Sequence, residues 1–229
     1  MKRTKFLTAE WPLSLQTIGN RLKARAFSEQ DREGFIVDRL RQRSIEARFI
    51  EKVVTSESVE DPFGNTESFE RTLYKQVKFV LATEYPQIHL IDPPRSVKLF
   101  INRLAQVMDF QVAIDSVQIR PEEWIEGLIA SGLDLERNGA ELSEVSVSEH
   151  TSAKIVFHSK KDIAHDIEDF LAGRAFTIDR IAVLFTDGRL KVQAQLSSDG
   201  SAKFSNDVPA AIAEMLRKNL PLTIPSTEG

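Results

Sequence analysis

The 229-residue chain contains no cysteine, and this absence removes several kinds of chemistry. Disulfide bonds, thiolate catalysis, zinc ribbons and cysteine-ligated iron–sulfur clusters all require that residue. Glycine is scarce, with 10 residues, and the glycine-rich motifs that hold nucleotide phosphates are missing. The motifs Gly-x-Ser-x-Gly and His-Glu-x-x-His are missing too. We therefore expect no cofactor, and the sequence leans away from an enzyme without deciding the matter.

Long hydrophobic runs are also absent, because no apolar stretch approaches the roughly 20 residues that a membrane-spanning helix needs. The first seven residues are basic but lack the apolar core of a signal peptide. We therefore expect a cytoplasmic protein without membrane contact. The net charge of −4 gives no general attraction to nucleic acid, although residues 1–55 carry +5 and the remainder −9. This asymmetry indicates either a binding face or, as we favour, two domains with different surfaces.

The clearest structural pattern lies in residues 176–220. Residues 189–196 alternate strictly between polar and apolar side chains, which is typical of a strand with one buried face. Asp187-Gly188 and Asp199-Gly200 stand at its two ends, and Asp-Gly is a strong hairpin signal. The segment therefore predicts three strands in a meander, followed by a helix.

The first eighty residues carry both helical and strand patterns. Residues 14–26 have apolar side chains at helical spacing, and the capping-box pattern from Ser28 to Asp31 predicts a second helix to about residue 41. Alternation over residues 45–54 and again over 69–81 predicts two strands joined by a turn-rich loop. Tyr74 lies on the polar side of the second strand, so we expect it to be exposed and to mark a partner surface.

These patterns predict an α+β fold in which antiparallel β-meanders carry helices packed on one face, in two subdomains. We expect roughly six helices and eight or nine strands. Residues 1–132 would form an N-terminal helical pair plus an α+β subdomain. Residues 133–225 would form a C-terminal α+β subdomain with a strand pair, a helix, a three-strand meander and a helix. The boundary is placed at the acidic segment that begins at residue 133, and Trp124, on a helical stripe just before it, is expected in the core.

Three groups of residues are candidate functional sites. The first is a basic segment that could follow a nucleic-acid backbone, since the arginine fork binds phosphate in two places; it comprises Arg39, Arg41, Arg43, Arg48 and Lys52. Acidic residues interrupt this segment, so a solvated surface of ion pairs is the default interpretation. The second is Arg95 with Ser96, which could bind an anion between the end of a strand and the start of the following helix. We favour the simpler interpretation, in which Ser96 caps that helix.

The third group combines imidazoles and carboxylates on or near one helical face, a combination that suits a divalent metal. Its members are His158, Asp162, His165 and Asp166. The alternative is that this helix simply needs a polar face.

The sequence as a whole favours a non-enzymatic protein-interaction or assembly subunit of a bacterial-type cytoplasmic complex, binding another protein or its own copy. Two alternatives stay open at this point. One is a nucleic-acid-binding module that uses the segment Arg39–Lys52, and the other is a metal-dependent hydrolase or nuclease that uses His158–Asp166.

Overall fold

The structure, a computed structural model, describes residues 2–171, 173–187, 190–208 and 210–223. Strand makes up 49% and helix 21%, so the protein is mainly β and the predicted α+β class is wrong. The described residues form eleven strands and five helices. By contact, the chain divides into one unit of residues Ala9–Ile114 and a second, which we call the terminal unit, of Met1–Thr8 and Asp115–Gly229. Residue 133, where the sequence places the boundary, lies within the terminal unit.

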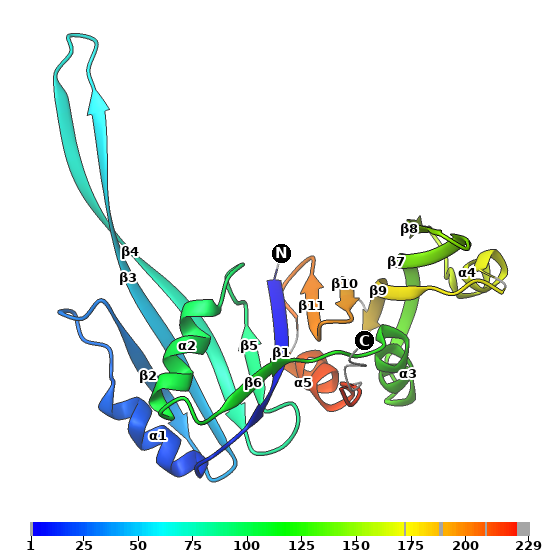
Figure 1. The fold of residues 1–229 in the computed structure, drawn as a ribbon, viewed down its shortest axis with the longest axis horizontal. Helices are drawn as coiled ribbons and strands as arrows, with labels where there is room; N and C mark the ends of the chain where they lie inside the picture. The colour runs from blue at the N-terminus through cyan, green and yellow to red at the C-terminus, as the bar shows by residue number, and fades with distance from the viewer. Residues whose placement is uncertain (1, 172, 188–189, 209, 224–229) are drawn as a thin grey trace. The chain divides into compact units, whose positions relative to one another are not determined.

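The 9–114 unit contains an antiparallel sheet with strand order β2-β3-β4-β5 (Figure 1). Its elements are α1 (Leu15–Ala24), β2 (Glu33–Leu40), β3 (Ser44–Glu60), β4 (Thr66–Ala82), β5 (Ile88–Ile91) and α2 (Lys98–Val107). The core is built around four aromatic rings with neighbouring centroids between 4.7 and 6.2 Å apart, those of Phe35, Phe49, Phe79 and Phe100. These rings join β2, β3 and β4 to α2, so they fix the base of the long β3–β4 hairpin.

The first predicted helix is confirmed and the second is wrong. Helix α1 begins after Ser14, whose hydroxyl accepts a hydrogen bond from the amide of Thr17 at 3.1 Å. Residues 33–40, predicted as helix, form strand β2, which pairs with β3. Ser28 and Asp31 do not cap a helix; the backbone N–H and the hydroxyl of Ser28 both donate to the Asp31 carboxylate and close a turn. The bunched apolar residues after this turn are what a strand buried against β3 requires.

The terminal unit contains a second antiparallel path, with order β1-β11-β10-β9-β7-β8. Its elements are β1 (Lys2–Glu10), α3 (Pro121–Ala130), β7 (Asp134–Ser148), β8 (Thr151–His158), α4 (Ala164–Leu171), β9 (Thr177–Asp187), β10 (Leu190–Ser197), β11 (Ser201–Phe204) and α5 (Ala210–Lys218), with β6 (Ala113–Ser116) where the chain enters the unit. Trp124 is fully buried, as predicted. Its indole Nε1 donates to the carbonyl of Leu216 at 2.9 Å and ties α3 to α5.

The predicted three-strand meander and the helix after it are confirmed as β9, β10, β11 and α5. Gly188 and Arg189, in the first predicted turn, lie outside the described residues. The acidic segment that begins at residue 133 forms the first half of β7, which pairs with β9 from Asp134 onward. Within the described part of the chain, no helix has the combination of length and apolar character needed to cross a membrane.

Candidate functional site

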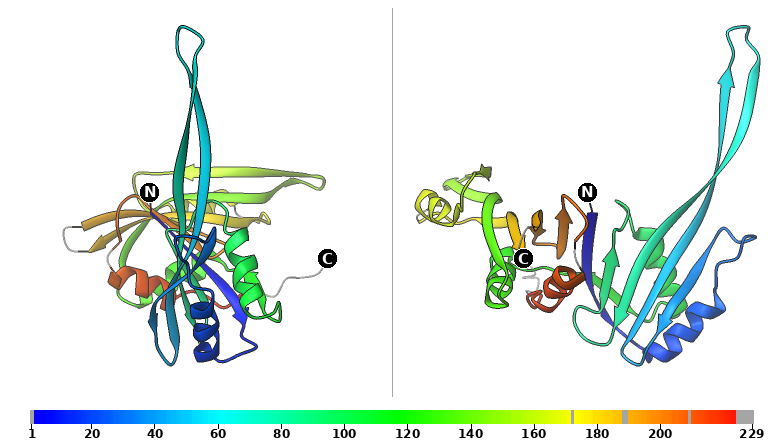
Figure 2. Two further views of the ribbon diagram at one scale, coloured as in Figure 1. Left: turned by 90° about the vertical axis from the view of Figure 1, so that its left-hand side faces the viewer. Right: turned by 180° about the vertical axis from the view of Figure 1, so that it is seen from behind.

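The outer part of the β3–β4 hairpin, residues 53–73, is a two-stranded ribbon with which no other described strand pairs. β2 pairs with β3 only as far as Glu51, and β5 pairs with β4 only over residues 78–81. Beyond those points β3 and β4 continue to pair with each other up to Glu60 opposite Thr66. Eight paired residues per strand give a length of about 26 Å. Figures 1 and 2 show this ribbon extending beyond β2 and β5, away from the core of its own unit.

One face of the ribbon continues the core face of the hairpin into solvent. Residues directly opposite each other in an antiparallel pair lie on the same face, and every second residue returns to it. The face that carries buried Phe49 at the base therefore carries four apolar residues farther out, which we call the apolar row: Val53, Leu73, Phe69 and Val59. Leu73, Phe69 and Val59 are 40%, 53% and 59% exposed. The described part of the chain therefore leaves these three side chains substantially exposed.

The opposite face of the ribbon is mainly hydroxylic. Its side chains include Ser56, Ser58, Thr66, Ser68 and Thr72, all from positions that alternate with the apolar row. Tyr74 lies at the base of this face, and its predicted exposure is confirmed at 57%. Its ring meets that of Phe27 edge to face, with centroids 6.1 Å apart. The two faces thus differ in chemistry, and the apolar row, although Thr55 and Arg71 interrupt it, lies on only one of them.

The loop at the ribbon tip is held in one shape by Asp61. Its carboxylate accepts hydrogen bonds from the backbone amide of Phe63 at 2.8 Å and from the backbone and side-chain amides of Asn65 at 2.9 and 2.8 Å. These bonds, led by the Asn65 side chain, lower the pKa of Asp61. Gly64 takes a φ of +86°, a conformation that glycine adopts without strain. The result is a fixed turn that displays Phe63 with 90% of its surface exposed.

The ribbon is acidic. Its residues 53–73 contain five carboxylates, Glu57, Glu60, Asp61, Glu67 and Glu70, against a single guanidinium, that of Arg71. Glu57 and Glu67 lie beside the apolar row on the same face, each directly opposite one of its members, Phe69 and Val59. A surface of this composition repels phosphate backbones and attracts basic proteins.

The basic residues predicted to bind nucleic acid lie near the base of the hairpin and are paired. Arg48 makes a two-pronged contact with Asp38 at 2.7 to 3.1 Å, and the hydrogen bond to Asp38 raises the pKa of the Arg48 guanidinium. Arg39 and Arg41 both approach one Glu46 oxygen, at 3.7 and 3.8 Å.

The remaining members of this group are engaged as well. Arg43 donates to Glu84 at 2.9 Å, and the Lys52 ammonium donates to the Glu29 carbonyl at 2.8 Å. The group therefore forms a surface of ion pairs, and its role in nucleic-acid binding stays a prediction.

Arg95 and Ser96 are exposed and precede helix α2. The predicted cap is wrong, because Val97 is the N-cap residue and no side chain makes a capping hydrogen bond there. Anion binding by this pair stays a prediction.

The structure does not assemble the predicted metal ligands. Asp162 uses one oxygen to accept from the Arg137 backbone amide at 3.1 Å and the other to accept from Ala164 at 2.9 Å, so it orders the start of α4. His158 ends β8, whereas His165 and Asp166 are exposed on α4. Over the described ranges, no set of three or more His, Asp or Glu side chains is arranged to hold a metal ion.

The ribbon was partly visible in the sequence. Alternation to Val54, the turn-forming residues 61–65 and the second alternating run indicated a hairpin and an exposed Tyr74. Residues 55–60 gave no such pattern, since the odd positions beyond Val53 are polar until Val59. The role of Phe63 was missed for lack of any signal that the tip is fixed rather than loose. No family model and no curated protein matches this sequence.

Proposed function

We propose that this protein is a docking subunit whose ribbon inserts into a groove on a partner protein. Phe63 acts as the anchor and the apolar row extends the contact along the ribbon. The observation that carries the proposal is the tip: an aromatic side chain, 90% exposed, held by the hydrogen bonds of Asp61 at the end of a ribbon outside the core. The proposal keeps the cytoplasmic location and the non-enzymatic role expected from the sequence.

Energetics support a binding role for the ribbon rather than a stabilising one. An isolated two-stranded hairpin is at best marginally stable in water. Phe69, Leu73 and Val59 are 40–59% exposed, so each forgoes about half of the roughly 1.5–3 kcal/mol that full burial of such a side chain brings. A partner that covers them recovers this free energy. Because the turn at Phe63 is already ordered, little conformational entropy is lost when the anchor binds.

The negative charges of the ribbon indicate what kind of partner surface would complement it. Glu57 and Glu67 flank the apolar row, and Glu60 and Asp61 lie beside the tip. The complementary surface is an apolar pocket for Phe63, continued by a groove with lysine and arginine at its rim. Opposite charges at the rim accelerate encounter, whereas the buried aromatic anchor determines how long the complex lasts.

The test has two stages. Proteins retained by the immobilised wild-type chain from its source cells are compared with those retained by Phe63→Ala and by the matched control Ser58→Ala, which changes the hydroxylic face. A protein held by wild type and Ser58→Ala but lost with Phe63→Ala is then purified and titrated. We expect Phe63→Ala to weaken that complex by about 30-fold or more. Glu57→Gln with Glu67→Gln should slow association several-fold at low salt only.

Three outcomes would contradict the proposal. Retention that is indifferent to Phe63 would remove the anchor, and association that does not depend on salt would remove the basic rim. A wild-type chain that dimerises in sedimentation, with Phe63→Ala monomeric, would replace the partner by a second copy of the chain. The nucleic-acid and hydrolase alternatives gain no support from the described residues and stay untested predictions.

A further inference from the structure

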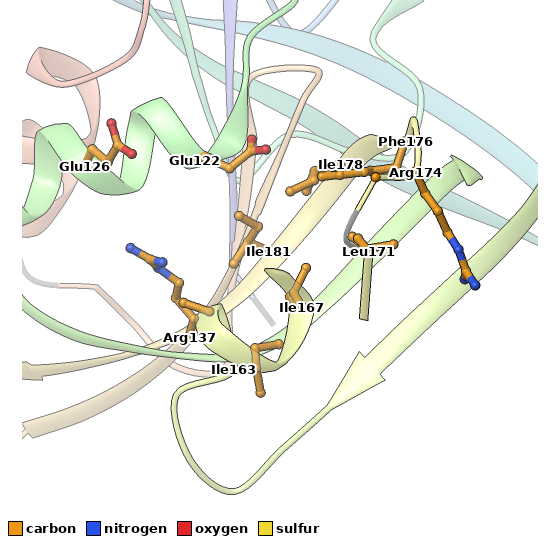
Figure 3. Close-up of a pocket in the computed structure, with 12 residues that line it drawn as sticks. Glu122, Glu126, Arg137, Ile163, Ile167, Leu171, Arg174, Phe176, Ile178 and Ile181 are labelled. Carbon is orange, nitrogen blue, oxygen red and sulfur yellow. The ribbon is translucent and has the colours of Figure 1, made fainter. Parts of the chain in front are cut away.

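The terminal unit contains a cavity of about 400 Å³, separate from the ribbon (Figure 3). This volume lies within the range of small-molecule sites, roughly 300–1,000 Å³. Its walls are largely aliphatic and aromatic side chains from α4 and β9 and the residues beside them: Ile163, Ile167, Leu171, Phe176, Ile178 and Ile181. Because Ile163 and Leu171 are also part of a buried cluster with β7, the α4 side of this wall is anchored to the sheet.

The carboxyl group of Glu122 is one of two that line this cavity, the other being that of Glu126. Glu122 comes from the first turn of α3, on the far side of the cavity from Ile167 (Figure 3). Its Oε2 atom is shielded from solvent and accepts no hydrogen bond from the residues that the structure describes. A buried carboxylate oxygen without a donor is unfavourable, because it has lost its hydrogen bonds to water without gaining others. A ligand that places a hydrogen-bond donor in this cavity would therefore supply the bond that the Glu122 Oε2 atom lacks.

The other charged residues near the cavity do not supply that donor. Arg174 points away from it in Figure 3 and places its guanidinium 5.3 Å from the centre of the Phe170 ring. Glu126 and Arg137, an acid and a base, line the end away from Phe176 (Figure 3). Burial raises the pKa of Glu122; Glu123 and Glu126 also raise it, whereas its own backbone N–H and Arg120 act in the opposite direction. A cation beside Glu122 would favour its ionised form.

We propose that this cavity binds a small aliphatic amine, with its nitrogen on the Glu122 carboxylate and its hydrocarbon against Ile167, Ile178 and Ile181. An ammonium–carboxylate hydrogen bond is roughly twice as strong as one between neutral groups, so an amine is favoured over an alcohol of equal length. A fatty carboxylate is disfavoured beside Glu122, because two carboxylates would face each other there and Arg137 lies at the end of the cavity away from Phe176. The selectivity thus comes from one side chain, and the affinity from apolar area.

The experiment titrates the full chain with octylamine, octanol and octanoate. Binding is followed by calorimetry and by the methyl resonances of the cavity isoleucines, so that adsorption elsewhere is recognised. We expect octylamine to bind about tenfold more tightly than octanol, and octanoate to bind most weakly. Glu122→Gln should remove the preference for the amine and leave octanol unchanged, whereas the control Glu123→Gln, on the same helix but outside the cavity lining, should keep the preference.

A second variant keeps the proposal falsifiable if Glu122→Gln fails to fold. Ile167→Phe retains the carboxyl group and fills the cavity, so it should weaken octylamine and octanol alike. Equal affinities for amine and alcohol in the wild type would overturn the proposal, as would tighter binding of octanoate. So would an absence of shifts at the cavity methyl groups with all three probes, or undiminished octylamine binding by Ile167→Phe.

Discussion

The two halves of the β3–β4 hairpin share strands, register and alternation, yet one half is core and the other is in water. At the base, Phe79 is 1% exposed and packs against Phe35 and Phe100. On the same face of the ribbon, Phe69 is 53% exposed and faces Glu57 across the strands. Alternation therefore reports which side chains share a face. Whether that face is buried depends on what else in the molecule, or in a partner, lies against it.

Hydrogen exchange should show the largest difference between the two halves. Backbone amides of the base exchange only when the whole 9–114 unit unfolds. Those of the ribbon exchange through local opening, because no described strand pairs with its outer edges. With a global stability of several kcal/mol, we expect base amides such as those of Ala47 and Phe79 to exchange at least about a thousandfold more slowly than those of Ser58 and Ser68. Uniform protection along the hairpin would show that the ribbon is covered, by a second copy or otherwise, in the isolated protein.

Truncating one phenylalanine in each half sharpens the comparison. Phe79→Ala should lower the free energy of unfolding by about 3–5 kcal/mol, because it opens a cavity inside the aromatic cluster. Phe69→Ala should lower it by less than about 1 kcal/mol, since its ring is half in solvent. Urea unfolding followed by fluorescence measures both. A large loss in Phe69→Ala would mean that the ribbon is a structural element and would weaken the docking proposal.

The sequence predicted elements in which alternation and turn residues agree, and it failed where another pattern competed with them. The C-terminal meander joins its strands through short turns, so alternation and turn residues suffice to predict it. Strand β2 was predicted as helix because Ser28 and Asp31 match a capping box, and its apolar residues are bunched rather than alternating. Its partner is not distant, since a short turn joins β2 to β3 with Leu40 opposite Ile45. What the sequence lacked was a pattern that marks β2 as a strand.

The two candidate sites differ in how far apart their residues lie along the chain. The ribbon is local in sequence, so its turn and the strand residues 53–54 and 69–73 could be predicted, whereas residues 55–60 and 66–68 and the hydrogen bonds that fix Phe63 could not. The cavity brings together Glu122 of α3, Ile167 of α4 and Ile181 of β9, which are far apart along the chain. No spacing rule links them, because the arrangement depends on how the helices pack on the sheet. The predicted metal group is close in sequence, but its members form no metal-holding set among the described residues, so metal binding there stays a prediction.

Two glycines extend the comparison from side chains to backbone. A Cβ added at Gly34, in β2 beside the hairpin base, would come within 2.6 Å of the Cα of Phe27, so the crossing backbone would have to move. We expect Gly34→Ala to cost about 1–3 kcal/mol of global stability. A Cβ added at Gly64 would have no atom within 4 Å, but the new alanine would have to adopt the φ of +86° that this tip position requires. Its strain, about 1 kcal/mol, should disturb only the loop and leave the melting temperature nearly unchanged.

Thermal unfolding of both variants distinguishes these expectations. Equal losses would indicate that the tip folds cooperatively with the base, contrary to the independence argued from pairing. If instead Gly64→Ala alone weakens partner binding, the fixed shape of the tip matters for docking separately from the Phe63 ring itself.

The smallest expected effect is the pH dependence of the tip. Asp61 accepts the hydrogen bonds that fix Phe63 and Asn65 more strongly when it is ionised than when it is protonated, and these bonds lower its pKa below the usual value of about 3.9. A carboxyl group with a lowered folded-state pKa contributes order that is complete above its ordinary pKa and is lost as pH falls through the lowered one. The amide resonances of Phe63 and Asn65 should therefore stay constant from neutral pH to about pH 4 and shift below it. Asp61→Ala, which removes every acceptor oxygen, should show the disordered pattern at every pH, and a tip that shifts already near pH 5 would mean that Asp61 does not hold the turn.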